Sequence, residues 1–316
     1  MRRWKRMTAL LAAVIACCVL CTGCAKSGDD TESTKSGEST HGGGTNMPSG
    51  SVVSPGGSQV TVPSGASDVQ GNVNTPSVPV ASNATDFTAL DAKARGWGQG
   101  TQVDDKNRPI SSVQYQEKYG KYGAYFIAPE SKKVYLTFDE GYENGYSAKI
   151  LDALKEKKAS GVFFVTYDYV KKNPDLVRRM IDEGHIVGNH SYNHPSMPKI
   201  SMEKGKEEIQ KLHDYVKAEF NYTMTLFRPP MGEYSEQTLA MTQSLGYKTI
   251  FWSFAYKDWD PKNQMGADKA KEKVLKSLHP GAIYLLHAVS KDNAEILGAV
   301  IDEMRNQGYE IAKFDL

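Results

Sequence analysis

The amino-acid sequence predicts an α/β protein whose core is a parallel barrel of seven strands. From residue 134 to the end, seven short apolar runs alternate with six longer stretches of helical character, which is typical of a parallel sheet. No Gly-x-Gly-x-x-Gly pattern follows any of the runs, so a barrel is favoured over an open, dinucleotide-binding sheet. Polar side chains follow several strands directly, and the carboxyl ends of barrel strands are where catalytic residues gather.

Each element of this barrel has its own signal in the sequence. The predicted strands begin at Val134, Val162, Ile186, Leu226, Lys248, Ala282 and Glu310. The predicted helices cover 145–158, 174–183, 203–219, 235–245, 268–278 and 293–307. Asn173-Pro174 predicts a helix start, because proline suits the first helical position. Gly184, Gly246 and Gly308 follow three of the helices and suit the left-handed residue that ends a helix.

The N-terminus predicts export from a bacterial cytoplasm. A basic segment, residues 2–6, precedes an apolar run, 7–20, that is too short to span a membrane comfortably. The run closes in Leu20-Cys21-Thr22-Gly23-Cys24, which resembles a lipoprotein signal, so cleavage before Cys24 would leave that thiol to be lipidated. Ordinary secretion and a retained signal anchor are the alternatives. All three place the protein outside the cytoplasmic membrane.

The chain is expected to have four parts: a signal peptide at 1–24, a disordered Ser/Gly/Thr/Pro linker at 25–85, an N-terminal extension packed on the barrel at 86–130, and the catalytic domain at 131–316. The linker contains no aromatic residue, leucine or isoleucine, so it cannot bury enough apolar surface to fold. As a flexible tether it would reach roughly 40–45 Å.

Composition excludes several classes of function. All four cysteines lie within residues 17–24, so the main domain has neither a disulfide framework nor a thiolate metal site. The formal net charge is +1, so there is no electrostatic case for binding nucleic acid.

The first strand ends in two adjacent carboxylates. Val134, Leu136 and Phe138 predict a buried strand, which runs into Asp139 and Glu140. Because successive strand side chains point in opposite directions, the two acids can serve different partners, one as a base and the other with an ion. The alternative is an ordinary acidic turn.

Histidines and an arginine follow later strands. His190 and His194 lie four residues apart, and Pro195 confines them to a tight turn, where two imidazoles and a nearby carboxylate could bind a divalent metal. Arg228 precedes two prolines, which fix its backbone. His287 ends the sixth apolar strand. The alternatives are two surface histidines, a solvated arginine at a rigid turn, and a structural histidine.

Together these strand ends resemble the polysaccharide deacetylases with NodB homology, carbohydrate esterase family four. The resemblance covers about residues 134–316 and rests on Thr137-Phe138-Asp139-Glu140-Gly141, His190-Ser191-x-x-His194, Arg228-Pro229-Pro230, Asp258-Trp259 and Leu285-Leu286-His287. It implies a distorted (β/α)7 barrel of the NodB-homology type and a hydrolase that removes acetyl groups from sugar amides.

The resemblance also implies catalytic roles. Asp139 would be the base, oriented by Arg228 with the assistance of Asp258, and His287 would be the general acid. The backbone N–H of Met231 would help to hold the oxyanion. No nucleophile is needed, and the sequence has no Gly-x-Ser-x-Gly elbow.

For the metal, the resemblance implies binding by His190 and His194, with zinc as the expected ion. The family has a second aspartate at the position of Glu140, where it is the third ligand. The extra methylene of glutamate moves the carboxylate by about 1.5 Å. Either Glu140 ligates with a shifted backbone or rotamer, or the two histidines and water hold a weaker site.

Longer phrases extend the resemblance to about residue 96 and narrow it to the delta-lactam-biosynthetic de-N-acetylases, the PdaA type. They are Gly96-Trp97-Gly98, Gly141-Tyr142-Glu143-Asn144-Gly145-Tyr146, Pro280-Gly281-Ala282-Ile283-Tyr284-Leu285-Leu286-His287 and Asp292-Asn293-Ala294-Glu295. In that subfamily the substrate is the N-acetylmuramic acid of peptidoglycan, and deacetylation leads to the muramic delta-lactam of spore cortex. A lipid-anchored domain outside the cell membrane fits such a wall substrate, and the enzyme is expected to act on glycan strands as a monomer.

Three other functions compete with this interpretation. A general N-acetylglucosamine or chitooligosaccharide deacetylase would share the catalytic residues but not the Gly-Trp-Gly region. An O-acetyl esterase would differ only in the bond cut. A non-catalytic wall-binding module would follow if Glu140 abolished metal binding, but such a module has no use for both a base and an acid.

Overall fold

The computed structural model describes residues 86–316. The predicted signal peptide, Cys24 and the linker lie outside the described residues. Within 86–316, no helix has the length and apolar character needed to cross a membrane.

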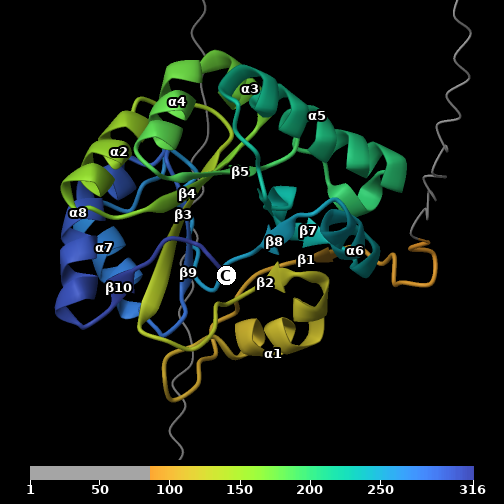
Figure 1. The fold of residues 1–316 in the computed structure, drawn as a ribbon. Helices are drawn as coiled ribbons and strands as arrows, with labels where there is room; N and C mark the ends of the chain where they lie inside the picture. Colours follow the sequence, from red (N-terminus) through yellow and green to blue (C-terminus); the bar gives the residue numbers. More distant parts are fainter. Residues whose placement is uncertain (1–85) are drawn as a thin grey trace, which may run out of the picture. The chain divides into compact units, whose positions relative to one another are not determined.

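A curled parallel sheet forms the centre of the fold, with helices packed around it (Figure 1). Its strands run in the order β10-β3-β4-β5-β6-β8-β2, and β9 pairs with β3. The bounds are β2 Ala124–Tyr125, β3 Lys133–Glu140, β4 Gly161–Val165, β5 Ile186–Asn189, β6 Leu226–Phe227, β8 Lys248–Ile250, β9 Ile283–His287 and β10 Glu310–Ile311. A single bridge between Phe254 and Tyr284 links the segment after β8 to β9. The prediction of a distorted parallel barrel is thus confirmed: the strands form a curled parallel sheet, a half-barrel.

Helices follow most of the strands, as expected for βα units. They are α2 Ser147–Glu156, α3 Tyr167–Lys172, α4 Pro174–Asp182, α5 Met202–Phe220, α6 Glu236–Ser244, α7 Ala267–Lys276 and α8 Lys291–Asn306. The helix start at Pro174 is confirmed, and Gly184, Gly246 and Gly308 have φ values of 81°, 83° and 80° just after α4, α6 and α8. All seven predicted strands and all six predicted helices are present.

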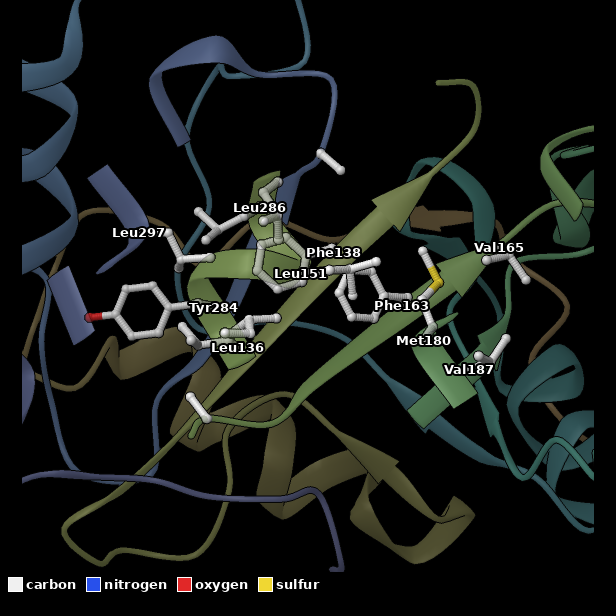
Figure 2. Close-up of a cluster of buried hydrophobic side chains, with 14 of the residues drawn as sticks. Leu136, Phe138, Leu151, Phe163, Val165, Met180, Val187, Tyr284, Leu286 and Leu297 are labelled. Carbon is white, nitrogen blue, oxygen red and sulfur yellow. The ribbon is translucent and has the colours of Figure 1, made fainter. Parts of the chain in front are cut away.

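The two faces of β3 decide where its terminal carboxylates point. Leu136 and Phe138 pack with side chains of α2 and α8, between the sheet and the helices (Figure 2). Tyr135 faces the other way and packs with residues of β4, β8 and β9, which identifies the concave face of the sheet. By the same alternation Asp139 belongs to the concave face and Glu140 to the helix-covered face. Each buried side chain of this size contributes about 1.5–3 kcal/mol, so a slip of one residue is strongly disfavoured.

The N-terminal extension packs against the segments that follow β6 and β8. It contains α1 (Ile110–Tyr119) and β1 (Arg95–Gly96), and β1 pairs antiparallel with β7 (Glu233–Tyr234). Trp97 donates from its indole N–H to the carbonyl of Trp252 at 2.9 Å. Phe126 stacks on Phe251 with 4.3 Å between ring centroids. The extension therefore supports the chain that lines one side of the concave face.

Candidate active site

Asp139 ends β3 on the concave face, with its side chain almost completely buried. Its Oδ1 accepts a hydrogen bond from Arg228 Nη1 at 2.8 Å, and Oδ2 lies 3.5 Å from His190 Nε2. Burial disfavours the carboxylate, but the positive charge of Arg228 and the hydrogen bond that it donates outweigh burial and lower the pKa of Asp139. A carboxylate held ionised inside a cleft is available to accept a proton.

Arg228 is fully buried and its guanidinium is fixed on every side. Besides the bond to Asp139, it donates from Nε to the carbonyl of Ile250 and from Nη2 to that of Phe251, both at 3.0 Å. The guanidinium also lies 4.3 Å from the ring centroid of Phe164. As predicted from the prolines that follow it, this arginine is held in place, so it can orient one carboxylate.

The two histidines of the predicted metal pair lie together in a turn after β5. Nδ1 of His190 lies 2.8 Å from the carbonyl oxygen of Arg228. A carbonyl can only accept, so Nδ1 carries the proton and the lone pair is on Nε2. That Nε2 lies 3.2 Å from Nε2 of His194. Burial lowers the pKa of His190 to about 4 and also lowers that of His194, so both imidazoles are neutral at pH 7.

This arrangement fits a metal ion. Two nitrogens bound tetrahedrally to one zinc at about 2.05 Å would lie about 3.3 Å apart. The backbone supports the turn: Ser191 and His194 have φ values of 67° and 58°, and Ser191 Oγ accepts a bond from the His194 N–H at 2.9 Å. Strained backbone of this kind is typical of functional sites. Among residues 86–316, however, no three His, Cys, Asp or Glu side chains are grouped as a metal site.

Glu140, the predicted third ligand, is not part of this arrangement. It is fully buried on the helix-covered face of β3, where Oε2 accepts a hydrogen bond from Ser147 Oγ at 3.3 Å. Oε1 has no hydrogen-bond partner among the described residues. Burial, reinforced by the neighbouring Glu143, raises the pKa of Glu140 well above its usual range. The structure corrects the prediction because strand alternation directs Glu140 away from the two histidines.

His287 ends β9 directly opposite Asp139 in the parallel register of β3 and β9. Its Nδ1 lies 2.7 Å from Asp258 Oδ1, and its backbone N–H donates to Asp258 Oδ2 at 2.8 Å. Burial opposes a charge on this imidazole, but the hydrogen bond and negative charge of Asp258, with that of Asp139, raise the pKa of His287. His287 is therefore poised to carry a proton, with Nδ1 bound to the carboxylate.

Asp258 occupies a different place from the predicted one. It was expected to assist Arg228, but its oxygens are used by His287 and by Asn293, whose amide donates to Oδ2 at 2.7 Å. Arg228 meanwhile has its own partners in Asp139 and two backbone carbonyls. Asp258 orients the histidine, and Arg228 orients the aspartate.

Asn293 is a site residue that the sequence reasoning missed. It lies in the first turn of α8 and also accepts a bond from the Tyr256 hydroxyl, at 2.5 Å. Its amide donates to Asp258 and, at 3.2 Å, to the carbonyl of His287. Asn293 belongs to the motif Asp292-Asn293-Ala294-Glu295, which indicates the subfamily but contains no local pattern that links Asn293 to Asp258.

Asp139, His287 and the two histidines of the metal pair line one pocket of about 500 Å³. It is lined by Asp139, His190, His194, Met231, Gly232, Trp252, Ala255, Tyr256, Trp259, Leu285 and His287. Met231, a lining residue that is 55% exposed, has a φ of 57°, a left-handed conformation that is rare for this residue type. The pocket thus combines a carboxylate, a histidine bound to a carboxylate, and two neutral imidazoles beside apolar walls. These groups could catalyse hydrolysis of a polar bond by accepting and donating protons.

This fold and site define the class of protein. Residues 127–250 match the family model for polysaccharide deacetylase. The chain belongs to this family, carbohydrate esterase family four, and is a polysaccharide deacetylase, a hydrolase that acts on amide bonds. Deacetylases of the family are metal-dependent. The resemblance predicted from the strand-end motifs is therefore confirmed.

Individual relatives narrow the class further. The chain is 41% identical to the peptidoglycan-N-acetylmuramic acid deacetylase PdaA of Bacillus subtilis, an alignment that covers 75% of this chain and 91% of the relative. The solved structure of that protein, a family 4 carbohydrate esterase, matches with a TM-score of 0.68 over 71% of this chain and 96% of that one. An uncharacterized 30.6 kDa protein of Geobacillus stearothermophilus is 47% identical over 68% of this chain and 83% of the relative.

Proposed function

We propose that the protein removes the N-acetyl group from N-acetylmuramic acid in peptidoglycan, with a divalent metal, zinc, held by His190 and His194. The observation that carries this proposal is that Asp139 and His287, 148 residues apart in sequence, are register partners on β3 and β9 and line one pocket with the histidine pair. The muramic acid specificity is supported by the likeness to the Bacillus subtilis PdaA along 91% of its length.

The reaction is hydrolysis of the acetamide bond. Asp139, oriented by Arg228, takes a proton from the attacking water, whose oxygen bonds to the acetyl carbon. His287 donates a proton to the sugar nitrogen as the C–N bond breaks, so acetate and a free amine are released. When bound, the metal would supply Lewis-acid polarisation of the acetyl carbonyl and of the water. The backbone N–H of Met231 is proposed to stabilise the oxyanion.

The pocket walls suit the acetyl group itself. Leu285 and Trp252 are apolar side chains that line the pocket, and they offer contacts to a methyl group. Gly232 lies against the Trp252 ring: a Cβ there would be 2.7 Å from the Cη2 atom of that tryptophan. A larger residue at 232 would therefore displace the ring of Trp252, which lines the pocket.

Metal content should separate the roles of His190, His194 and Glu140. Replacing both histidines by alanine should abolish binding of one zinc per chain, because it removes both neutral imidazole donors. Glu140→Gln should retain that zinc, because this carboxyl is buried on the other face of β3. The measurement is elemental analysis of the purified full-length chain, with zinc affinity by titration calorimetry. Loss of zinc in Glu140→Gln, or its retention in the double variant, would show that the ligand set is wrong.

The substrate can be tested against the alternative of a general chitooligosaccharide deacetylase. With the proposed specificity, acetate release from glycan strands stripped of stem peptides should exceed release from chitooligosaccharides of similar length. Both substrates present acetamides to the same catalytic residues, so the comparison isolates recognition of the sugar. Faster release from chitooligosaccharides would favour the alternative.

The site of action is proposed to be the cell wall, reached from a lipid anchor at Cys24 through the linker 25–85. The support is the lipoprotein-like signal and the peptidoglycan substrate proposed above. Action outside the cytoplasm fits the named activity of the Bacillus subtilis relative. The protein is proposed to work there as a monomer.

A further inference from the structure

The side chain of Gln99, in the N-terminal extension, supports one wall of the catalytic pocket without lining that pocket. Its Oε1 accepts a hydrogen bond from the indole N–H of Trp252 at 3.1 Å, and its Nε2 donates to the backbone carbonyl of Ala255 at 3.0 Å. Trp252 and Ala255 both line the catalytic pocket, whereas Gln99 does not. Gln99 can therefore influence a substrate through the two residues that it holds.

These two hydrogen bonds allow only one orientation of the Gln99 amide. An indole N–H can only donate and a carbonyl can only accept, so the amide oxygen faces Trp252 and the amide nitrogen faces Ala255. Gln99 is itself anchored, because its backbone carbonyl accepts a hydrogen bond from the hydroxyl of Ser111 in the first turn of α1. The extension thus fixes both the tryptophan ring and the backbone three residues after it.

The ring of Trp252 has little other freedom. It is 8% exposed, and its backbone carbonyl accepts the hydrogen bond from Trp97 described above. On the pocket side, Gly232 leaves just enough room for the ring, since a Cβ there would be 2.7 Å from Cη2. The indole has a single hydrogen-bonding group, its N–H, so the bond to Gln99 is the polar contact that sets the rotation of the ring.

We infer that Gln99 is a positioning residue that determines which acyl group the catalytic pocket accepts. This inference rests on the proposed function, in which the methyl of the acetyl group contacts Trp252 and Leu285. A ring held by Gln99 keeps the space beside these two side chains matched to a methyl group, and a ring without that bond yields to a longer chain. One methylene in an apolar pocket changes discrimination by about 10–200-fold, so the position of this wall has a measurable effect.

The test compares two acyl groups on the same polymer. Peptide-free glycan strands are prepared with N-acetyl or with N-propionyl groups, and the zinc-loaded full-length protein is assayed for release of acetate and propionate. Gln99→Met removes both hydrogen bonds and keeps the length of the side chain. It should reduce the preference for acetyl, expressed as a ratio of kcat/KM values, by about three- to tenfold, the factor that one hydrogen bond supplies. An unchanged preference would overturn the inference.

Gln116→Met is the matched control, because Gln116 is a glutamine of the same extension with a purely structural place. It donates to the carbonyl of Ala124 at 3.0 Å and accepts from the N–H of Phe126 at 2.8 Å. Its replacement should lower the unfolding temperature but leave the acetyl preference as it is. The same relaxed preference in Gln116→Met would contradict the inference, since any loosening of the extension would then have this effect.

A double-mutant cycle tests whether Gln99 acts through Trp252. Phenylalanine has no N–H for Gln99 to hold, so Gln99→Met should change the acetyl preference no further in a Trp252→Phe background. An equal change in both backgrounds would refute the role of Trp252.

The same ratio on N-acetyl and N-propionyl chitooligosaccharides separates this inference from the proposed function. A relaxed preference there supports the role of Gln99 even if muramic acid is not the substrate. A preference that stays at the wild-type value on both polymers refutes it whichever sugar is deacetylated.

Discussion

Asp139→Asn should lower the rate of deacetylation by about 10²–10⁴-fold, the usual contribution of a general base. The amide has the shape of the carboxylate but cannot take a proton from water. The change also leaves the fully buried Arg228 without its counter-ion, so the unfolding temperature should fall even though the fold is retained. Steady-state acetate release and circular dichroism measure the two effects.

A surface carboxylate supplies the control for this prediction. Asp302 pairs with Lys157 at the surface, where its side chain is 51% exposed. Asp302→Asn should change neither the rate nor, by more than a small amount, the stability. If Asp139→Asn retained near-full activity with the same preparation, Asp139 would not be the base.

Replacing His287 by alanine should cost a similar factor, about 10²–10⁴-fold, because it removes the proton donor to the leaving amine. Asp258→Asn should affect the same proton transfer by changing its dependence on pH. The carboxylate of Asp258 raises the pKa of His287, so the acid stays protonated to higher pH. Loss of that charge lowers the pKa, and the alkaline limb of the rate profile should move to lower pH.

Asp260→Asn is the matched control for the shift in pH profile. Asp260 lies two residues from Asp258, but it does not line the catalytic pocket. Its substitution should leave the alkaline limb in place. An Asp258→Asn profile that kept the wild-type limb while losing rate uniformly would indicate that Asp258 only supports the local structure.

The sequence was sufficient for the parts of the fold that local patterns determine. Apolar runs such as 134–138 located the strands, and Gly184, Gly246 and Gly308 located helix ends, because only a left-handed residue suits those positions. The short helix α3, Tyr167–Lys172, was not predicted, because six residues are too few to establish a helical period.

For the candidate site, too, local sequence patterns predicted some features, and others depend on the fold. Alternation along β3 predicted that Asp139 and Glu140 have different partners, and the structure assigns Asp139 to the concave face. The pairing of Asp258 with His287 depends on the path of the chain between β8 and α7, which no local pattern determines.

The most direct test of the proposed function is mass spectrometry of muropeptides from peptidoglycan incubated with the full-length protein and zinc. The proposal predicts products that have lost an acetyl group from muramic acid, with N-acetylglucosamine intact, and no such products with Asp139→Asn. Acetyl loss from glucosamine alone would contradict the proposed specificity. Unchanged muropeptides with zinc-loaded wild-type protein would contradict the proposed action on peptidoglycan.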